Sequence, residues 1–86
     1  MYKLKDGIYM ETLEDGAVLL DTISERIVVL ADEEKNILDA ILNRESGDVV
    51  KQMLEKYDGE RNIIEQDINS FIEKLKENNF IESYNG

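Results

Sequence analysis

The residues from Asp58 to Asn69 come nearest to a chemical motif in this sequence. Asp58, Glu60 and Asn62 are spaced like the first ligands of a calcium-binding loop. The pattern then fails, because the sixth position is Ile63 where a glycine is needed and the twelfth is Asn69 where a bidentate glutamate is needed. We therefore expect no calcium here, and no metal or cofactor elsewhere in the chain.

Histidine and cysteine are both absent from the chain. Their absence removes thiolate and imidazole metal ligands, Cys and His nucleophiles, and the usual general base at neutral pH. The scattered glycines show none of the spacing of a phosphate-binding loop, and the serines have no histidine as a base. Because no candidate catalytic residue is present, we expect a binding protein rather than an enzyme. An enzyme that uses carboxylates alone is the least favoured of the functions considered.

Composition narrows the class of partner. Twenty acidic residues against ten basic ones give a net charge of -10, and 42% of the residues are hydrophobic. Most lysines have acidic neighbours in the sequence and form no basic cluster, so we expect no nucleic-acid partner. An acidic surface instead favours a cationic partner. No membrane span or signal peptide is visible, so a cytoplasmic location is the default. The 86 residues predict one domain, 1–86, with short flexible ends at about 1–6 and 83–86.

The elements that would build a binding surface begin with a β-hairpin. Apolar runs at 8–13 and 17–20 meet across Glu14, Asp15 and Gly16. We favour a three-residue loop with Gly16 in the left-handed conformation over a two-residue Asp15-Gly16 turn. The favoured loop puts the following side chains on one face of the hairpin: Ile8, Met10, Thr12, Val18 and Leu20.

A third strand at 26–30 is apolar on both faces, with Ile27 and Val29 pointing one way and Val28 and Leu30 the other. If the three strands pair in order, this strand lies at the edge of the sheet with unpaired N–H and C=O groups. No charge or proline guards its apolar run, so it can accept a strand from another chain. The alternatives are that the last helix covers this edge or that a homodimer pairs it.

Three helices follow the strands. The first has Asp32 as its N-cap and runs to about Asn43; Ser46 caps the second, which Asp58-Gly59 ends. The third starts at a capping box of Asn62 and Glu65 and ends at Asn78 and Asn79, after which Phe80 and Ile81 return to the core. The apolar stripes of the three helices are Ile37, Leu38, Ile41 and Leu42; Val49, Val50, Met53, Leu54 and Tyr57; and Ile64, Ile68, Phe71, Ile72 and Leu75.

The predicted fold class is therefore α+β, a three-stranded antiparallel meander followed by three helices. This outline is winged-helix-like, and helix-turn-helix DNA readers share it. The acidic charge argues against the same function, so a winged-helix nucleic-acid binder is kept only as a low-ranked alternative.

Three segments together resemble the PqqD-like family, also called RiPP recognition elements, over nearly the whole chain. The first is GAVLLDTISERIVVLADEEKNIL, in which a short strand leads straight into a helix. The second is SGDVVKQMLEKYDGE, a helix followed by a tyrosine and a turn. The third is QDINSFIEKLKENNFIE, a closing helix with a final apolar pair. Their order and spacing carry the resemblance.

The resemblance implies a domain that binds the leader segment of a ribosomally made precursor peptide. The leader would add as an antiparallel strand to the third strand and place side chains in a groove against the third helix. Of the helix residues, Ile68, Phe71 and Leu75 have ordinary core positions as an equal alternative. Carried over to this chain, the peptide-binding residues are Arg26, Ile27, Val28, Val29 and Leu30 on the strand and Ile64, Asp67, Ile68, Phe71 and Leu75 on the helix.

A free-standing domain of this size looks most like the separate recognition subunit of lasso-peptide systems. By resemblance, it would deliver the leader to a leader peptidase. The alternative is a peptide chaperone for a radical-SAM modifying enzyme of the PQQ or sactipeptide type. Because leaders similar to those of lasso peptides often carry Lys near their apolar anchors, Asp67 or Glu65 could steer them.

Overall fold

The computed structural model describes residues 2–43, 46–56 and 59–84, without the side chains of 46–49. The expected helix residue Tyr57, the turn residue Asp58 and the side chains of Ser46 and Val49 lie outside this description. The elements in chain order are β1 (Tyr2–Leu4), β2 (Ile8–Leu13), β3 (Gly16–Asp21), β4 (Arg26–Ala31), α1 (Asp32–Asn43), α2 (Ser46–Lys56), α3 (Arg61–Glu77) and β5 (Ile81–Ser83).

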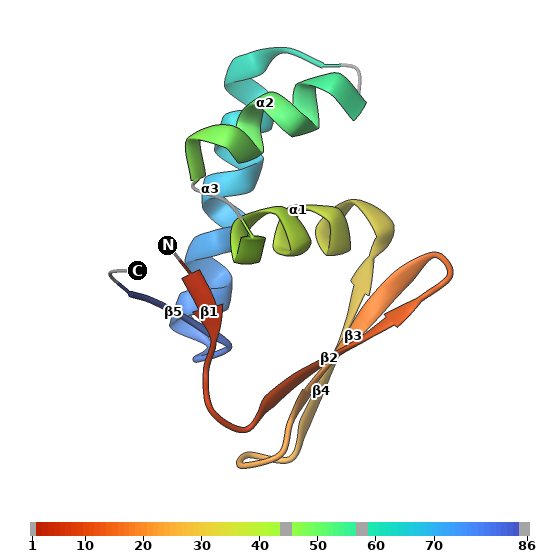
Figure 1. Ribbon diagram of the computed structural model, residues 1–86, viewed down its shortest axis with the longest axis vertical. Helices are drawn as coiled ribbons and strands as arrows, with labels where there is room; N and C mark the ends of the chain where they lie inside the picture. Colours follow the sequence, from red (N-terminus) through yellow and green to blue (C-terminus); the bar gives the residue numbers. More distant parts are fainter. Residues whose placement is uncertain (1, 44–45, 57–58, 85–86) are drawn as a thin grey trace.

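The α+β class is confirmed, with an antiparallel sheet of order β2-β3-β4 followed by three helices. In Figure 1 this sheet projects below α1, and α3 runs beside the sheet. Helix α2 packs against the N-terminal end of α3, away from the sheet. The core lies between the inner face of the sheet and the helices, and its largest fully buried side chains are Leu19, Leu38, Ile41, Ile68 and Ile81. No helix in the described ranges is long and apolar enough to cross a membrane.

The hairpin has a different register from either loop considered above. Leu13 pairs with Gly16, so Glu14 and Asp15 form a two-residue turn. Gly16 does not have a positive φ; it is needed because a Cβ at this position would run into the carbonyl oxygen of Leu30 on β4. The predicted three-residue loop was wrong because it attributed Gly16 to backbone conformation rather than to this close approach across the sheet.

The change of register moves half of the predicted face to the other side of the sheet. Ala17 and Leu19 of β3 are fully buried, whereas Val18 and Leu20 lie on the opposite face and are half-buried. A shift by one residue has this effect because side chains alternate along a strand. The buried face of the sheet therefore combines Ile8 and Met10 with Ala17 and Leu19.

The helix ends are set by contacts that differ in part from the predicted caps. Asp32 is the first residue of α1 rather than its cap, and the Glu34 carboxylate accepts the backbone N–H of Ala31 at 2.9 Å. Helix α3 begins at Arg61, after an extended Glu60 without a side-chain cap hydrogen bond. The capping box of Asn62 and Glu65 was therefore wrong.

The predicted end of α3 is confirmed and takes the form of a Schellman motif. Asn79 has a φ of 63°, and the N–H groups of Asn79 and Phe80 donate to the carbonyls of Lys76 and Leu75 at 3.1 and 2.9 Å. The motif reverses the chain and buries Phe80 and Ile81 against the core, as predicted.

The sequence did not predict β1 and β5. Tyr2, Lys3 and Leu4 pair antiparallel with Ser83, Glu82 and Ile81, so both ends of the described chain meet in a second small sheet. Lys3 and Glu82 form an ion pair across it at 3.3 Å. Part of the ends expected to be flexible, 2–4 and 83, is thus paired, because two distant segments supply strands that are too short to be recognised singly.

Candidate functional site

Strand β4 forms one edge of the three-stranded sheet, as predicted, because it pairs with β3 alone. The orientation of its side chains is also confirmed. Ile27 and Val29 are 70% and 71% exposed, whereas Leu30 is buried and Val28 is half-buried on the opposite face. An apolar edge strand of this kind is a surface on which another chain can pair.

The backbone groups on the open edge can be identified from the register. In an antiparallel pair, alternate residues direct their N–H and C=O groups to the neighbouring strand. The N–H of Ala31 donates to Glu34 instead of to β3, so Val29 and Ile27, two and four residues earlier, also face the open side. Glu34 thus occupies one end of the edge and leaves the groups of Ile27 and Val29 for a partner.

A groove of about 510 Å³ runs between this edge strand and α3. Its floor is mainly apolar, with a half-buried Phe71 and a buried Leu75 from α3 and Phe80 from the segment that follows. The expected alternative that α3 covers the edge does not hold, because the helix stands beside β4 with this hollow between them. The residues that line the groove are Arg26, Ile27, Val28, Val29, Leu30, Glu34, Phe71, Lys74, Leu75, Asn78 and Phe80.

A second hollow of about 290 Å³ continues the groove toward the start of α1. The two hollows share Glu34, Phe71 and Lys74, so they meet along one face of α3. The second one adds the carboxylates of Glu33 and Asp67. The combined groove therefore has an apolar part beside β4 and an acidic part beside the start of α1.

The structure brings most of the predicted site residues together. All five strand residues line the groove beside β4 with Phe71 and Leu75, and Asp67 lines the second hollow. Ile68 is 2% exposed and belongs to the core, and Ile64 is half-buried against the core and lines neither hollow. The three helix residues that could be core or groove therefore differ. Ile68 belongs to the core, Leu75 is buried in the floor of the groove, and Phe71 packs against the core and also lines the groove.

The sequence reasoning missed four residues of the hollow beside β4: Glu34, Lys74, Asn78 and Phe80. In the second hollow it also missed Glu33, Ile37 and Ser70. Lys74 lies one helical turn after Phe71 and could have been found from helical spacing. Phe80 was assigned only to the core, and Asn78 only to the end of α3. No local pattern signals that the Schellman motif brings these two residues to the start of β4.

Arg26 ties the start of β4 to the end of α3. Its guanidinium donates to the Asp21 carboxylate through Nε and Nη2 at 3.1 and 2.8 Å, and Nη2 also donates to the Asn78 carbonyl at 2.6 Å. The same group stacks on Phe80, with Cζ 4.6 Å from the ring centroid. Arg26 therefore closes one end of the groove and sets the distance between its two walls at that end.

Asp21 is the buried carboxylate that holds Arg26 in place. Its Oδ1 accepts the backbone N–H groups of Ile23 and Ser24 at 3.1 and 3.0 Å. The hydrogen bond from Ser24, followed by that from Arg26, lowers the pKa of Asp21 below its ordinary value of 3.8. The ionised form is therefore the one that the fold stabilises.

We expect Asp21→Asn to lower the free energy of unfolding at pH 7 and to make it less sensitive to acid. A carboxyl group whose folded pKa is depressed contributes stability above its ordinary pKa, and this contribution is lost as the pH falls through the folded value. Urea unfolding of both proteins at pH 7, 5 and 3 checks this. An equal difference between them at pH 7 and pH 3 would contradict it.

The geometry supports binding of an extended chain, with backbone groups along β4 for pairing and apolar positions on α3 for side chains. In the described part of the chain, no group of three or more acidic side chains is placed to hold a metal ion. The acidic part of the groove suits a basic side chain of the bound segment.

Comparisons with known proteins found one family model and two similar solved structures. The family model described as coenzyme PQQ synthesis protein D (PqqD) matches residues 14–81. The structure of "Lasso peptide synthetase B1 complexed with the leader peptide" is 29% identical, with a TM-score of 0.88 over 95% of this chain and 98% of that one. The structure of "TbiB1 in Complex with the TbiA(beta) Leader Peptide" has the same fold, with 21% identity and a TM-score of 0.87 over 98% and 99% of the two chains. No curated protein matches the sequence significantly.

Proposed function

The chain belongs to the PqqD family, and we propose that it binds the leader segment of a ribosomally synthesised precursor peptide as an added strand on β4. The observation that carries the proposal is the open edge at Ile27 and Val29 beside a groove floored by Phe71 and Leu75. The protein contributes binding and no catalysis of its own. It is a recognition subunit whose role is to bind the peptide.

The pathway that we propose is lasso-peptide biosynthesis, with delivery of the leader to a leader peptidase. The support is the similarity to lasso peptide synthetase B1, a chain of nearly the same extent whose structure holds a leader peptide. The description of the family model favours the alternative, a chaperone that presents a peptide to a radical-SAM enzyme such as that of the PQQ pathway. The two pathways differ in the enzyme that receives the peptide, whereas the groove serves either.

The proposed antiparallel pairing fixes the direction of the bound segment, and the groove residues suggest its anchors. Because β4 runs toward α1, an antiparallel peptide begins near Glu33 and Glu34 and ends near Arg26. A Lys or Arg in the first part of the segment would lie by Glu34 and Asp67, and apolar anchors further on would contact Phe71. Glu65 lies away from both hollows, so Asp67 is the better candidate for steering a basic leader.

The expected affinity follows from these contacts. Each backbone hydrogen bond contributes about 0.5–1.5 kcal/mol net, and each buried apolar anchor about 1.5–3 kcal/mol. The cost of ordering the peptide offsets part of this sum, which leaves a dissociation constant of roughly micromolar to nanomolar order.

The direct test is a titration with the fluorescein-labelled synthetic leader of a candidate precursor peptide. We expect saturable binding in the micromolar range or tighter, with a one-to-one stoichiometry. A scrambled leader of the same composition is the control, because it keeps the charge and loses the spacing of the anchors. Equal binding of the two peptides would contradict recognition by the groove.

A further inference from the structure

Strand β4 runs directly into α1, and one side chain joins the two elements. Ala31 is the last residue of the strand and Asp32 is the first residue of the helix, with no loop between them (Figure 1). The carboxylate of Glu34, the third residue of α1, accepts the backbone N–H of Ala31 at 2.9 Å. A glutamate at this helical position commonly bonds the N–H of the residue before the helix. The helix thereby holds the end of the edge strand.

This hydrogen bond limits the ladder that a guest strand can form on β4. A guest on an antiparallel edge pairs with the N–H and C=O groups of alternate residues, which here are Ile27, Val29 and Ala31. The N–H of Ala31 is taken by Glu34, and the C=O of a residue that precedes a helix accepts the first hydrogen bond of that helix. Both groups of Ala31 therefore serve α1, and the guest ladder ends at Val29.

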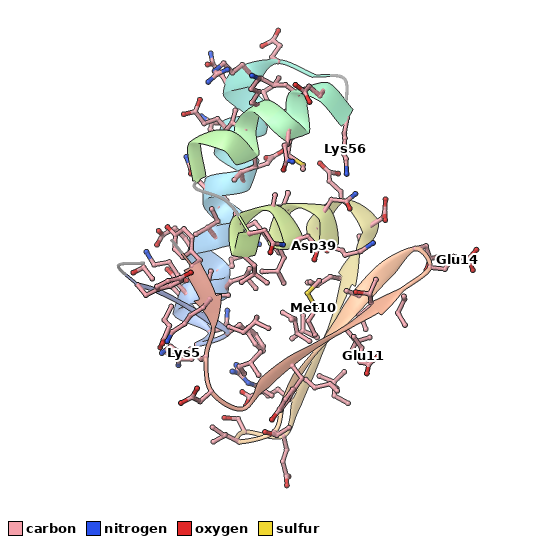
Figure 2. The ribbon with its side chains drawn as sticks, viewed as in Figure 1. Lys5, Met10, Glu11, Glu14, Asp39 and Lys56 are labelled. Carbon is pink, nitrogen blue, oxygen red and sulfur yellow. The ribbon has the colours of Figure 1, made fainter. Side chains whose placement is uncertain are left out.

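The side chains of a guest strand can be placed from the same register. Val28 of β4 lies opposite Leu19, and Leu19 lies opposite Met10. Figure 2 shows Met10 directed toward α1 and its neighbour Glu11 directed away from the helices. Val28 and Leu30 therefore belong to the face that carries the groove, and both line it. Guest residues opposite these two point the same way, since paired residues of neighbouring strands share a face.

Two successive groove-facing residues of the guest then have different surroundings. Because the guest is antiparallel to β4, the residue opposite Leu30 precedes the residue opposite Val28 by two positions. The later side chain enters the apolar part of the groove beside Phe71. The earlier one lies toward the second hollow, which Glu34 and Asp67 line.

The charge of the second hollow favours a basic side chain at the earlier position. Its charged lining groups are the carboxylates of Glu33, Glu34 and Asp67 and the ammonium group of Lys74, which leaves a negative balance. A guest Lys or Arg is attracted there, whereas a guest Asp or Glu is repelled. A basic residue two positions before an apolar anchor therefore matches both parts of the groove at once.

We propose that Glu34 sets the register of the bound peptide, and that this peptide carries a Lys or Arg two positions before an apolar anchor. The proposal rests on the proposed function, because it takes the peptide to pair along β4. A slip of two residues along the strand moves every anchor by about 7 Å. Toward α1, such a slip gains no new pair at Ala31 and carries the anchor past Phe71. Away from α1, it puts the basic side chain in the apolar part of the groove, where its charge is desolvated without the carboxylate of Glu34.

The charge is tested with three versions of a candidate leader. An alanine scan first identifies its apolar anchor, and the residue two positions earlier is then made Lys, Gln or Glu. By fluorescence anisotropy, we expect the wild-type chain to bind the Lys version about three- to fivefold more tightly than the Gln version, and the Glu version most weakly. Glu34→Gln should reduce these differences, because Gln keeps an acceptor for the Ala31 N–H and removes the charge. Equal affinity of the wild type for all three versions would overturn the proposed preference.

The end of the ladder is tested by amide hydrogen exchange of the full ¹⁵N-labelled chain with and without the leader. In the wild type, the leader should slow exchange of the Ile27 and Val29 amides by about tenfold or more and leave Ala31 unchanged. Glu34→Ala frees the N–H of Ala31, so the leader should then slow Ala31 as well. The matched control is Glu33→Ala, which removes a carboxylate from the same helical turn and the same hollow and should keep the wild-type pattern at Ala31.

The outcomes separate this inference from the proposed function. If the leader slowed Ala31 as strongly as Val29 in the wild type, or failed to slow Ala31 in Glu34→Ala, Glu34 would not end the ladder. If the leader bound without slowing Ile27 and Val29, strand addition on β4 would be wrong, and the register inference would fail with it.

Discussion

Phe71→Ala is expected to weaken binding of the leader peptide by about tenfold to a hundredfold while the chain still folds. Phe71 lines both hollows of the groove and is half-buried, so a large part of its ring is available to an anchor side chain of the peptide. Burying an aromatic side chain contributes about 1.5–3 kcal/mol, and each 1.4 kcal/mol corresponds to about a factor of ten in affinity. Fluorescence anisotropy with the labelled leader measures the change.

Two substitutions on the same helix separate a groove effect from a general loss of structure. Ile63→Ala removes an exposed side chain outside the groove and should leave both affinity and stability unchanged. Ile68→Ala removes a side chain that is 2% exposed in the core and should lower the free energy of unfolding by about 2–5 kcal/mol. If Phe71→Ala kept the wild-type affinity, or lost as much stability as Ile68→Ala, Phe71 would be a core residue only.

Val29→Pro is expected to weaken binding of the leader by about a hundredfold or more while β4 stays in the sheet. The N–H of Val29 faces the open edge, so proline removes a donor that a guest strand would use and leaves the ladder between β3 and β4 intact. The ring also obstructs the close approach of a neighbouring backbone. The combined effect is a loss of affinity of about a hundredfold or more, because pairing must then break on both sides of this position.

The opposite result is expected one residue earlier. Val28 pairs with Leu19 and directs its N–H to β3, so Val28→Pro should destabilise the sheet itself. Val29→Thr retains the N–H and a β-branched side chain, and it should bind the leader within a few-fold of the wild type. Circular dichroism and leader titration of the three variants distinguish these outcomes. Full leader binding by Val29→Pro would contradict strand addition on β4 while leaving the groove as a possible site.

The overall plan of the fold followed from local patterns. Apolar runs bounded by turn residues placed three strands before position 31, and stripes at helical spacing placed three helices after it. The end of α3 at Asn78 and Asn79 was also predictable, since asparagine tolerates the left-handed conformation that a helix end requires. These features depend on neighbours in the sequence, which is why a single sequence suffices for them.

The candidate site was predictable where it depended on one strand or one helix. The run Ile27–Leu30 indicated an edge strand without guarding charge, and the family resemblance implied that Phe71 and Leu75 of the helical stripe lie beside it. The same stripe could not separate Ile68 from Phe71, although Ile68 faces the core and Phe71 the groove. That separation depends on how α3 is rotated against the sheet, which no local pattern contains.

The sequence by itself determined the order and type of the main elements, the acidic charge and the lack of Cys and His. Only the tertiary structure decided the hairpin register, the pairing of β1 with β5, and the contacts of Arg26 with Asp21, Asn78 and Phe80 that close the groove. The physical reason is that helix and strand periodicity are set by residues a few positions apart. A groove is set by the approach of segments far apart in the chain, such as the carbonyl of Leu30 against Gly16.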